Sequence, residues 1–437
     1  MKTHFRLLTL ASAATLWATS SQAQSVQPQA PSVEKLTLTE AEQIAVRNHP
    51  RIQAAVNLAS AAKAQVTQAR SAYYPTVYGS LTGAYAESNS RIAAGVLNNP
   101  IIYDRYANGV TVSQLVTDFG RTHELVTSSN LRAQAEQESV VTSTADVLLQ
   151  VDQSYFATLK AQSVLAVAEE TVKARQLASD QVTELAKNKI RSDLDVNFAN
   201  VNLAQAQLLL IQSQNDLRSS FARLSAALGY SDQRTYQLAD QPLPAAPPSD
   251  VSVLIQQALQ DRPELVGQRF TVGSSQSYAK AERDLKLPTV SALGAAGLVP
   301  YNQAPLAPRY AAAGFNVNIP IFNGHLFSAL QSEAMSRAQA ENQYLRDLQN
   351  QIVRDVQSAW LNANSAFQRL SVTERLLNQA NQALDLAQSR YSLGLSSIIE
   401  LSQAELNETE ARIEQASAIY DYQAQYSFLN YQLGALR

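Results

Sequence analysis

The feature that most constrains the fold is a long stretch, residues 121–228, that contains neither glycine nor proline. It is rich in Ala, Gln, Ser, Asn and Leu with single scattered charges, which favours helix packed on one face and hydrated on another. We expect a break near residues 187–192. At ~1.5 Å per residue, the part before the break would form a helix of roughly 100 Å and the part after it one of roughly 55 Å. Since a globular domain needs no helix of this length, the sequence predicts an elongated molecule.

A second stretch, residues 326–433, repeats the first without a gap. Arg132-Ala-Gln-Ala-Glu136 corresponds to Arg337-Ala-Gln-Ala-Glu341, Tyr155 to Trp360, and Leu228-Gly229 to Leu433-Gly434. Such sustained registration indicates an internal duplication. Gly229 and Gly434 stand where a helix C-cap glycine is expected.

The segments before the long stretches are duplicated too. We predict helices over residues 38–74, interrupted at Asn48-His49-Pro50 and ended by Pro75. The same order recurs over residues 251–287, with the interruption at Asp261-Arg262-Pro263 and the stop at Pro288. Each copy therefore begins with a short helix, a proline break and a longer helix.

Four β segments follow these helices, at residues 76–85 and 110–116 in the first copy and 289–298 and 315–322 in the second. The last is the clearest, because the apolar residues Phe315, Val317, Ile319 and Ile321 alternate with Asn316, Asn318 and Pro320. A soluble sandwich would show the same alternation. The tyrosines near the segment ends favour membrane strands, joined by loops over residues 86–109 and 299–314.

The N-terminus predicts export. Lys2 and Arg6 precede an apolar run and Ser21-Gln22-Ala23, so residues 1–23 read as a signal peptide and residues 24–35 as a flexible arm. The absence of Cys excludes disulfides, thiol catalysis and a lipid-modified N-terminal Cys. No later segment has enough consecutive apolar residues for a membrane-spanning helix, so any membrane insertion is expected to use β-structure. A formal charge of -3 gives no indication of a nucleic-acid partner.

The chain therefore divides into a first repeat at residues 36–229, a Pro-rich linker at 230–250, and a second repeat at 251–437. Each repeat is two strands followed by a long helical hairpin. Four strands cannot close a barrel, and open strand edges are not tolerated in hydrocarbon, so the chain must oligomerise. Three copies would leave room for a passage, but these physical arguments alone permit more than one copy number.

The chain resembles the TolC family of outer-membrane efflux ducts over essentially its whole mature length. The resemblance rests on the two proline breaks, on Asp118-Phe119-Gly120-Arg121 after a strand, on Pro320-Ile-Phe-Asn-Gly324, and on Tyr391-Ser-Leu-Gly-Leu395. It implies a mainly α fold with a membrane β-barrel: a homotrimer whose twelve-stranded barrel lies in outer-membrane lipid and continues as a twelve-helix periplasmic barrel. A periplasmic adaptor and an inner-membrane pump would dock at the helical tip. Neither an enzymatic activity nor a cofactor is implied.

The resemblance also implies a gate at the two breaks within the hairpins. In this family a tyrosine and an arginine of the inner hairpin contact an aspartate of the outer hairpin, with an acidic ring nearby. Tyr391 stands at the tyrosine, Asp195 at the aspartate and Glu400 at the ring. Ser396 replaces the arginine, and Gln403 replaces a second ring acid. Arg191 and Asp193 complete the candidate gate residues, and an inverted lock would have Arg191 reach Glu400 of a neighbour.

Local structure offers a second role for the same residues. Ser192 with Asp195, and Ser397 with Glu400, have the spacing of capping boxes. The positively charged side chains at the first break would also stabilise the C-terminal end of the helix that precedes it. The candidate adaptor-docking residues at the two breaks are Gly394, Leu395, Lys189 and Ile190.

Two alternatives to an efflux duct remain open from the sequence. The chain could be the outlet of a type I protein secretion system, or a soluble periplasmic coiled-coil structural protein. No metal-ligand spacing, phosphate loop or catalytic acid pair is visible, so we expect no metal site and no catalytic residue.

Overall fold

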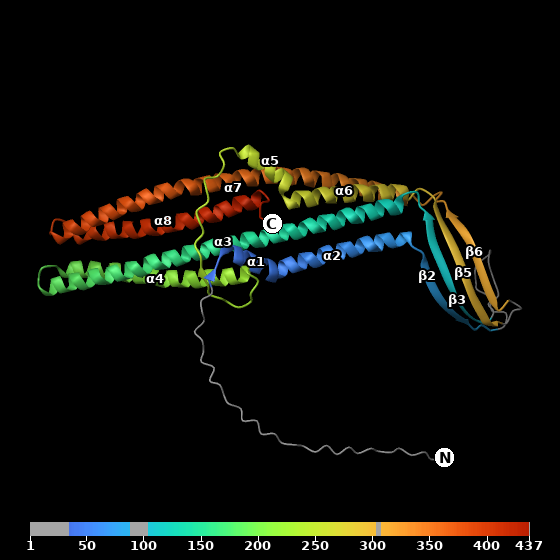
Figure 1. The fold of residues 1–437 in the computed structure, drawn as a ribbon, viewed down its shortest axis with the longest axis horizontal. Helices are drawn as coiled ribbons and strands as arrows, with labels where there is room; N and C mark the ends of the chain where they lie inside the picture. The colour runs from blue at the N-terminus through green and yellow to red at the C-terminus, as the bar shows by residue number, and fades with distance from the viewer. Residues whose placement is uncertain (1–34, 88–103, 303–306, 437) are drawn as a thin grey trace, which may run out of the picture.

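The protein is elongated, with four long helices at one end and a single β-sheet at the other (Figure 1). The computed structural model describes residues 35–87, 104–302 and 307–436. The predicted signal peptide and all but the last residue of the predicted arm lie outside these ranges. Within the described ranges, no helix is both long and apolar enough to cross a membrane.

The helices repeat in length as well as in order. The first copy has α1 (Leu38–Asn48), α2 (Pro50–Arg70), the short 3₁₀ helix η1 (Ser71–Tyr73), α3 (Arg121–Lys187) and α4 (Asp193–Ala227). The second has α5 (Val251–Asp261), α6 (Pro263–Asp284), α7 (Leu326–Ser392) and α8 (Ile398–Gln432). Both α3 and α7 have 67 residues, and both α4 and α8 have 35. Equal lengths in both copies are what a duplicated unit produces.

The prolines separate the short helices by ending one and starting the next. His49 is both the C-cap of α1 and the N-cap of α2. In the second role its Nδ1 accepts a hydrogen bond from the Arg51 N–H at 3.2 Å. Pro50 and Pro263 each occupy the first helical position, where a missing N–H costs nothing. Gly229 and Gly434 have positive φ values of 85° and 72° just beyond α4 and α8, which confirms them as C-cap glycines.

The sheet has the antiparallel order β2-β3-β5-β6, so β2 and β6 are its edges. Its strands are β2 (Thr76–Ala84), β3 (Arg105–Thr117), β5 (Thr289–Asn302) and β6 (Arg309–Asn318).

Three predicted strand boundaries were wrong. The strands predicted at 110–116 and 289–298 are longer, and the one predicted at 315–322 lies at 309–318. Ala, Asn and Gly, which have weak β propensity, hide the added ends of β3 and β6, and Pro300, which lacks an N–H, hides that of β5. Pro320 follows the end of β6.

The strand register gives the sheet one polar and one mostly apolar face. Paired residues share a face, so Thr111 of β3 lies beside Tyr78 of β2, and Ser291 of β5 beside Asn316 of β6. The polar face carries Tyr78, Ser80, Thr82, Thr111, Ser113, Ser291, Asn316 and Asn318, with the apolar Leu293, Ala295 and Ala312 among them. The opposite face carries Val77, Leu81, Val110, Val112, Ala292, Ala296, Leu298, Ala311, Phe315 and Val317, with the polar Asn108, Gln114 and Arg309 among them. Such a sheet can face water on one side and lipid on the other.

The linker between the copies is a structured strap, which the sequence did not predict. Its β4 (Gln237–Leu238) pairs in parallel with β1 (Lys35–Leu36). The hydroxyl oxygen of the buried Tyr155 of α3 lies 2.9 and 2.7 Å from the carbonyl oxygens of Leu36 and Ala239, which share its single proton. From the other copy, Trp360 Nε1 donates to the Pro248 carbonyl at 2.7 Å. The strap therefore contacts both α3 and α7, and its Tyr236 and Leu238 are part of the hydrophobic cluster around Tyr155.

Candidate gate at the helical turns

The turns between α3 and α4 and between α7 and α8 lie together at the end of the molecule farthest from the sheet (Figure 1). Both are Schellman motifs, with Ile190 N–H donating to the Leu185 carbonyl and Leu395 N–H to the Arg390 carbonyl. The corresponding residues Lys189 and Gly394 have φ values of 59° and 75°. The duplication therefore preserves the turn even where a lysine takes the glycine position.

Tyr391 links the two turns. Its side chain packs in an apolar cluster with Ile398 and Leu401, against which Phe198 of α4 packs from the other hairpin. Arg191 of the first turn donates from Nη2 to the Tyr391 carbonyl at 2.6 Å, and its guanidinium carbon lies 4.0 Å from the centre of the ring. A cation over an aromatic face and a charged hydrogen bond therefore join the two hairpins.

Burial raises the pKa of the Tyr391 phenol, with smaller contributions from the negative charges of Asp195 and Glu405, while the Arg191 charge opposes the shift. The phenol is therefore neutral at physiological pH. Its buried hydroxyl has no hydrogen-bond partner among the described residues. The tyrosine–aspartate hydrogen bond implied by the family resemblance is thus not formed within this protomer.

Asp195 forms the predicted capping box. Ser192 Oγ accepts from the Asp195 N–H at 3.2 Å, and the Asp195 carboxylate accepts from the Ser192 N–H at 3.1 Å. Asp193 is exposed in the same first turn of α4. Two carboxylates therefore stand at a helix N-terminus, where the dipole favours negative charge.

The second capping box was predicted wrongly. Ser397 caps α8 by accepting from the Glu400 N–H at 3.4 Å, but the Glu400 carboxylate turns away to Arg390 Nε at 3.0 Å. The Arg390 guanidinium lies across the turn, and the Glu400 carboxylate pairs with this charged group in preference to the backbone N–H of Ser397. Within one protomer Arg191 contacts Tyr391 and Glu400 contacts Arg390, so an Arg191–Glu400 contact between neighbours stays a prediction.

The remaining candidates are exposed. Ile190 and Leu395 are 66% and 67% exposed, next to the outward-facing Leu194 and Leu393. Lys189 and Gly394 are exposed between them. Exposed apolar side chains gathered on both turns are typical of a protein-binding surface.

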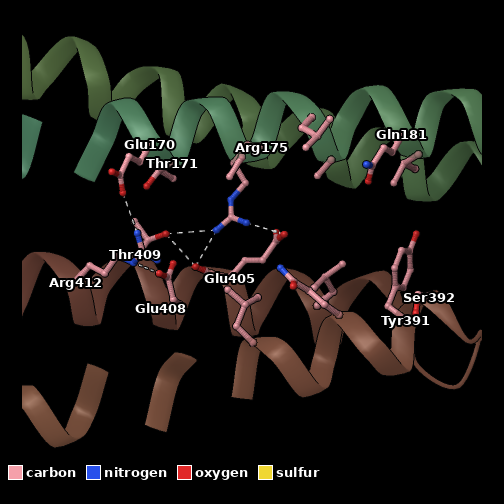
Figure 2. Close-up of a pocket in the computed structure, with 17 residues that line it drawn as sticks. Glu170, Thr171, Arg175, Gln181, Tyr391, Ser392, Glu405, Glu408, Thr409 and Arg412 are labelled. Atoms are coloured by element: carbon pink, nitrogen blue, oxygen red, sulfur yellow. Dashed lines mark hydrogen bonds and ion pairs between the residues drawn. The ribbon is translucent and has the colours of Figure 1, made fainter. Parts of the chain in front are cut away.

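Two ionic contacts near the gate have no signal in the sequence. One is Arg390 with Glu400, whose separation of ten residues across a turn has no helical periodicity to reveal it. The other is Arg175 of α3 with Glu405 of α8, which lie in different sequence repeats of the same chain (Figure 2). Only the packing of α3 against α8 brings this pair together. In the described ranges no group of His, Asp and Glu side chains could hold a metal ion.

Comparisons with known proteins agree with this architecture. Residues 42–230 and 254–435 match the family described as Outer membrane efflux protein. The chain is 21% identical over 340 residues to the outer membrane protein TolC of Escherichia coli, covering 73% of this chain and 69% of that protein. It is 24% identical to TolC of Vibrio cholerae, covering 86% of each. The solved outer-membrane channel OprN superposes with a TM-score of 0.81 at 17% identity, covering 91% of this chain and 90% of that one.

Proposed function

Because the chain belongs to the outer membrane efflux protein family, we propose that it is the outer-membrane exit duct of a tripartite efflux system. The duct is a passive homotrimer that crosses the outer membrane and extends into the periplasm. One observation carries this proposal. The same chain contains an open sheet with one mostly apolar face and two helical hairpins, each of which begins with a 67-residue helix. At ~1.5 Å per residue such a helix reaches roughly 100 Å.

The unpaired edges of the sheet support the trimer. In hydrocarbon, β2 and β6 cannot leave their N–H and C=O groups unpaired, so β6 of one copy pairs with β2 of the next. Three copies of four strands close a barrel wide enough for a passage, with the polar face inward and the apolar face toward lipid.

The gate is closed by the contact between Arg191 and Tyr391, repeated in each protomer. The cation that holds it comes from the first hairpin, which compensates for Ser396 at the position where the family has an arginine. Asp193 and Asp195 place carboxylates near the same constriction, and Glu400, which pairs with Arg390 inside one protomer, adds a third. Like charges repeated around an axis in a narrow passage attract cations and repel anions.

The exposed surface of Lys189, Ile190, Gly394 and Leu395 receives the periplasmic adaptor, which in turn connects the duct to an inner-membrane pump. An apolar patch at the far end of the helices is accessible to such a partner while the sheet is held in lipid. The duct has no catalytic residue, since opening and docking need only changes in packing and charge contacts.

An efflux measurement tests the proposal. The gene is deleted in its host, and the cells are loaded with a fluorescent dye that the host exports. We expect the deletion to raise dye retention and the full chain to restore export. A chain lacking residues 1–23 is the matched control, because it cannot leave the cytoplasm and should restore nothing.

The same cells give the location and the copy number. The protein should fractionate with the outer membrane and run as a heat-modifiable trimer on a denaturing gel. Unchanged dye retention across a panel of dyes, together with a soluble or inner-membrane location, would refute the proposed duct.

A further inference from the structure

Three ion pairs join the first hairpin to the second along α3 and α8, and they differ in burial. Lys160 pairs with Asp421 at 2.9 Å and Glu170 with Arg412 at 3.1 Å, with every side chain more than a third exposed. Arg175 pairs with Glu405 at 2.6 Å, and these side chains are only 10% and 8% exposed. Exposed pairs contribute little to stability, whereas separating a buried pair leaves uncompensated charge.

The buried pair has further bonds that fix its position. Arg175 Nη2 donates to the Glu405 carbonyl at 2.9 Å and approaches Thr409 Oγ1 at 3.4 Å. From α4, Asn202 Nδ2 donates to the second carboxylate oxygen of Glu405 at 3.4 Å. Burial raises the pKa of Glu405, and Arg175 opposes that shift. Three helices therefore meet at one charged node, which Figure 2 shows between the α3 and α8 ribbons.

The space around this node is open on both sides. A groove of about 540 Å³ lies between α3, α7 and α8, and another of about 320 Å³ lies between α3, α4 and α8. Arg175 and Glu405 line both grooves, so their ion pair separates them. The first groove continues from the node to Tyr391 and Ser392 at the turn. Between the node and the turn, α3 is therefore incompletely packed against α7 and α8.

The two contacts at the ends of that groove differ in strength. At the turn, Arg191 makes one hydrogen bond to a neutral carbonyl and lies over one ring, beside the apolar contact of Phe198. At the node, Arg175 bonds a carboxylate, a carbonyl and a hydroxyl. A hairpin drawn away from its neighbour therefore separates at the turn first and stays attached at the node.

We propose that the Arg175–Glu405 pair is the pivot on which the α7–α8 hairpin swings away from α3 and α4 when the duct opens. The node lies twelve residues before the end of α3, or about 18 Å along the helix. It therefore sets the length of the moving segment and the width of the opening. Arg175 and Glu405 are positioning residues that do not touch the cargo. The inference rests on the proposed duct function.

Cross-linking on either side of the node tests the pivot, and the chain's lack of Cys makes every introduced pair specific. Lys160→Cys with Asp421→Cys lies on the strap side of the node, and Gln181→Cys with Gln388→Cys spans the groove on the turn side. Each pair is built into an Arg191→Ala background, which removes the contact at the turn. Trimers are treated with a short bis-maleimide, and their conductance in planar bilayers is compared with that of untreated trimers.

We expect trimers linked at 160 and 421 to conduct as much as untreated Arg191→Ala trimers carrying the same cysteines. Trimers linked at 181 and 388 should return to the conductance of the wild type. A link at 160 and 421 that closes the duct, or a link at 181 and 388 without effect, would overturn the pivot. Unlinked trimers that do not conduct at all would count against the proposed duct itself.

Charge reversal gives a second test on the node. Glu405→Gln should raise conductance several-fold at an unchanged yield of trimer, because the hairpin loses its fixed point. Arg175→Glu combined with Glu405→Arg should return conductance to the wild-type level. If the double variant stays as conductive as Glu405→Gln, the pair has no pivot role.

Discussion

Replacing Arg191 by Ala removes the contact that joins the two turns, and its effect can be estimated from geometry. A hydrogen bond from a charged donor is worth about 1.5–3 kcal/mol, and a cation over an aromatic ring about 0.5–1 kcal/mol at exposed sites. Because Arg191 is only partly buried, we use the lower end, about 2 kcal/mol per protomer. That corresponds to roughly a thirtyfold shift toward the open gate per protomer. If the three protomers open together, the shift is about four orders of magnitude.

Single-channel conductance of purified trimers in planar bilayers measures this shift. We expect Arg191→Ala to spend far more time in the high-conductance level than the wild type, and Arg191→Lys to lie between them, because lysine keeps the charge but not the planar stacking. Lys187→Ala is the matched control, since it removes the same charge from the end of α3, where Lys187 pairs with the exposed Glu184. Equal open times for wild type and Arg191→Ala, or equal effects of Lys187→Ala and Arg191→Ala, would refute the lock.

Three further predictions concern selectivity and stability. Glu400→Gln should lower cation selectivity, measured as the reversal potential in a salt gradient, and an unchanged potential would remove Glu400 from the acidic ring. Burial and the nearby Glu42 carboxylate raise the pKa of Asp152 to about 7, so the folded state binds a proton that the unfolded state releases near pH ~4. The resulting stability is present below pH ~4 and lost as pH rises to ~7, so the thermal midpoint should fall over this window in wild type but not in Asp152→Asn. The strand register puts Arg105 on the polar face and Arg309 on the apolar face, so Arg105→Glu should shift selectivity toward cations while Arg309→Glu should not.

The helical part of the fold could be predicted because its signals are local and occur twice. The absence of Gly and Pro from 121–228 predicts a helical hairpin, and α3 and α4 occupy it with a break at Lys189. The predicted fold class, mainly α with membrane strands in a TolC-like architecture, is confirmed by the observed elements and by the superposition on OprN.

The strand ends could not be predicted equally well. Residues such as Ala311 and Gly314 pair in β6 although their side chains have weak strand propensity, because neighbouring β5 supplies the hydrogen bonds. The strap was missed for a related reason. Its order comes from donors such as Tyr155 and Trp360 on distant helices, which local sequence does not reveal.

The candidate gate was predictable only in part. The sequence predicts Tyr391 and Arg191 as gate residues, and the structure joins them, but through the Tyr391 carbonyl and ring instead of its hydroxyl. The partner of Glu400 and the Arg175–Glu405 node depend on how the two hairpins pack. Spacing within one helix carries no information about such contacts.

The most direct test of the proposed duct is a cryo-electron microscopy structure of the purified protein in lipid nanodiscs. We predict three copies, with β6 of each paired to β2 of the next and a single axial passage that is narrowest at the turns bearing Arg191 and Tyr391. A different copy number, unpaired β2 and β6 edges, or the absence of a continuous axial passage would contradict the proposal.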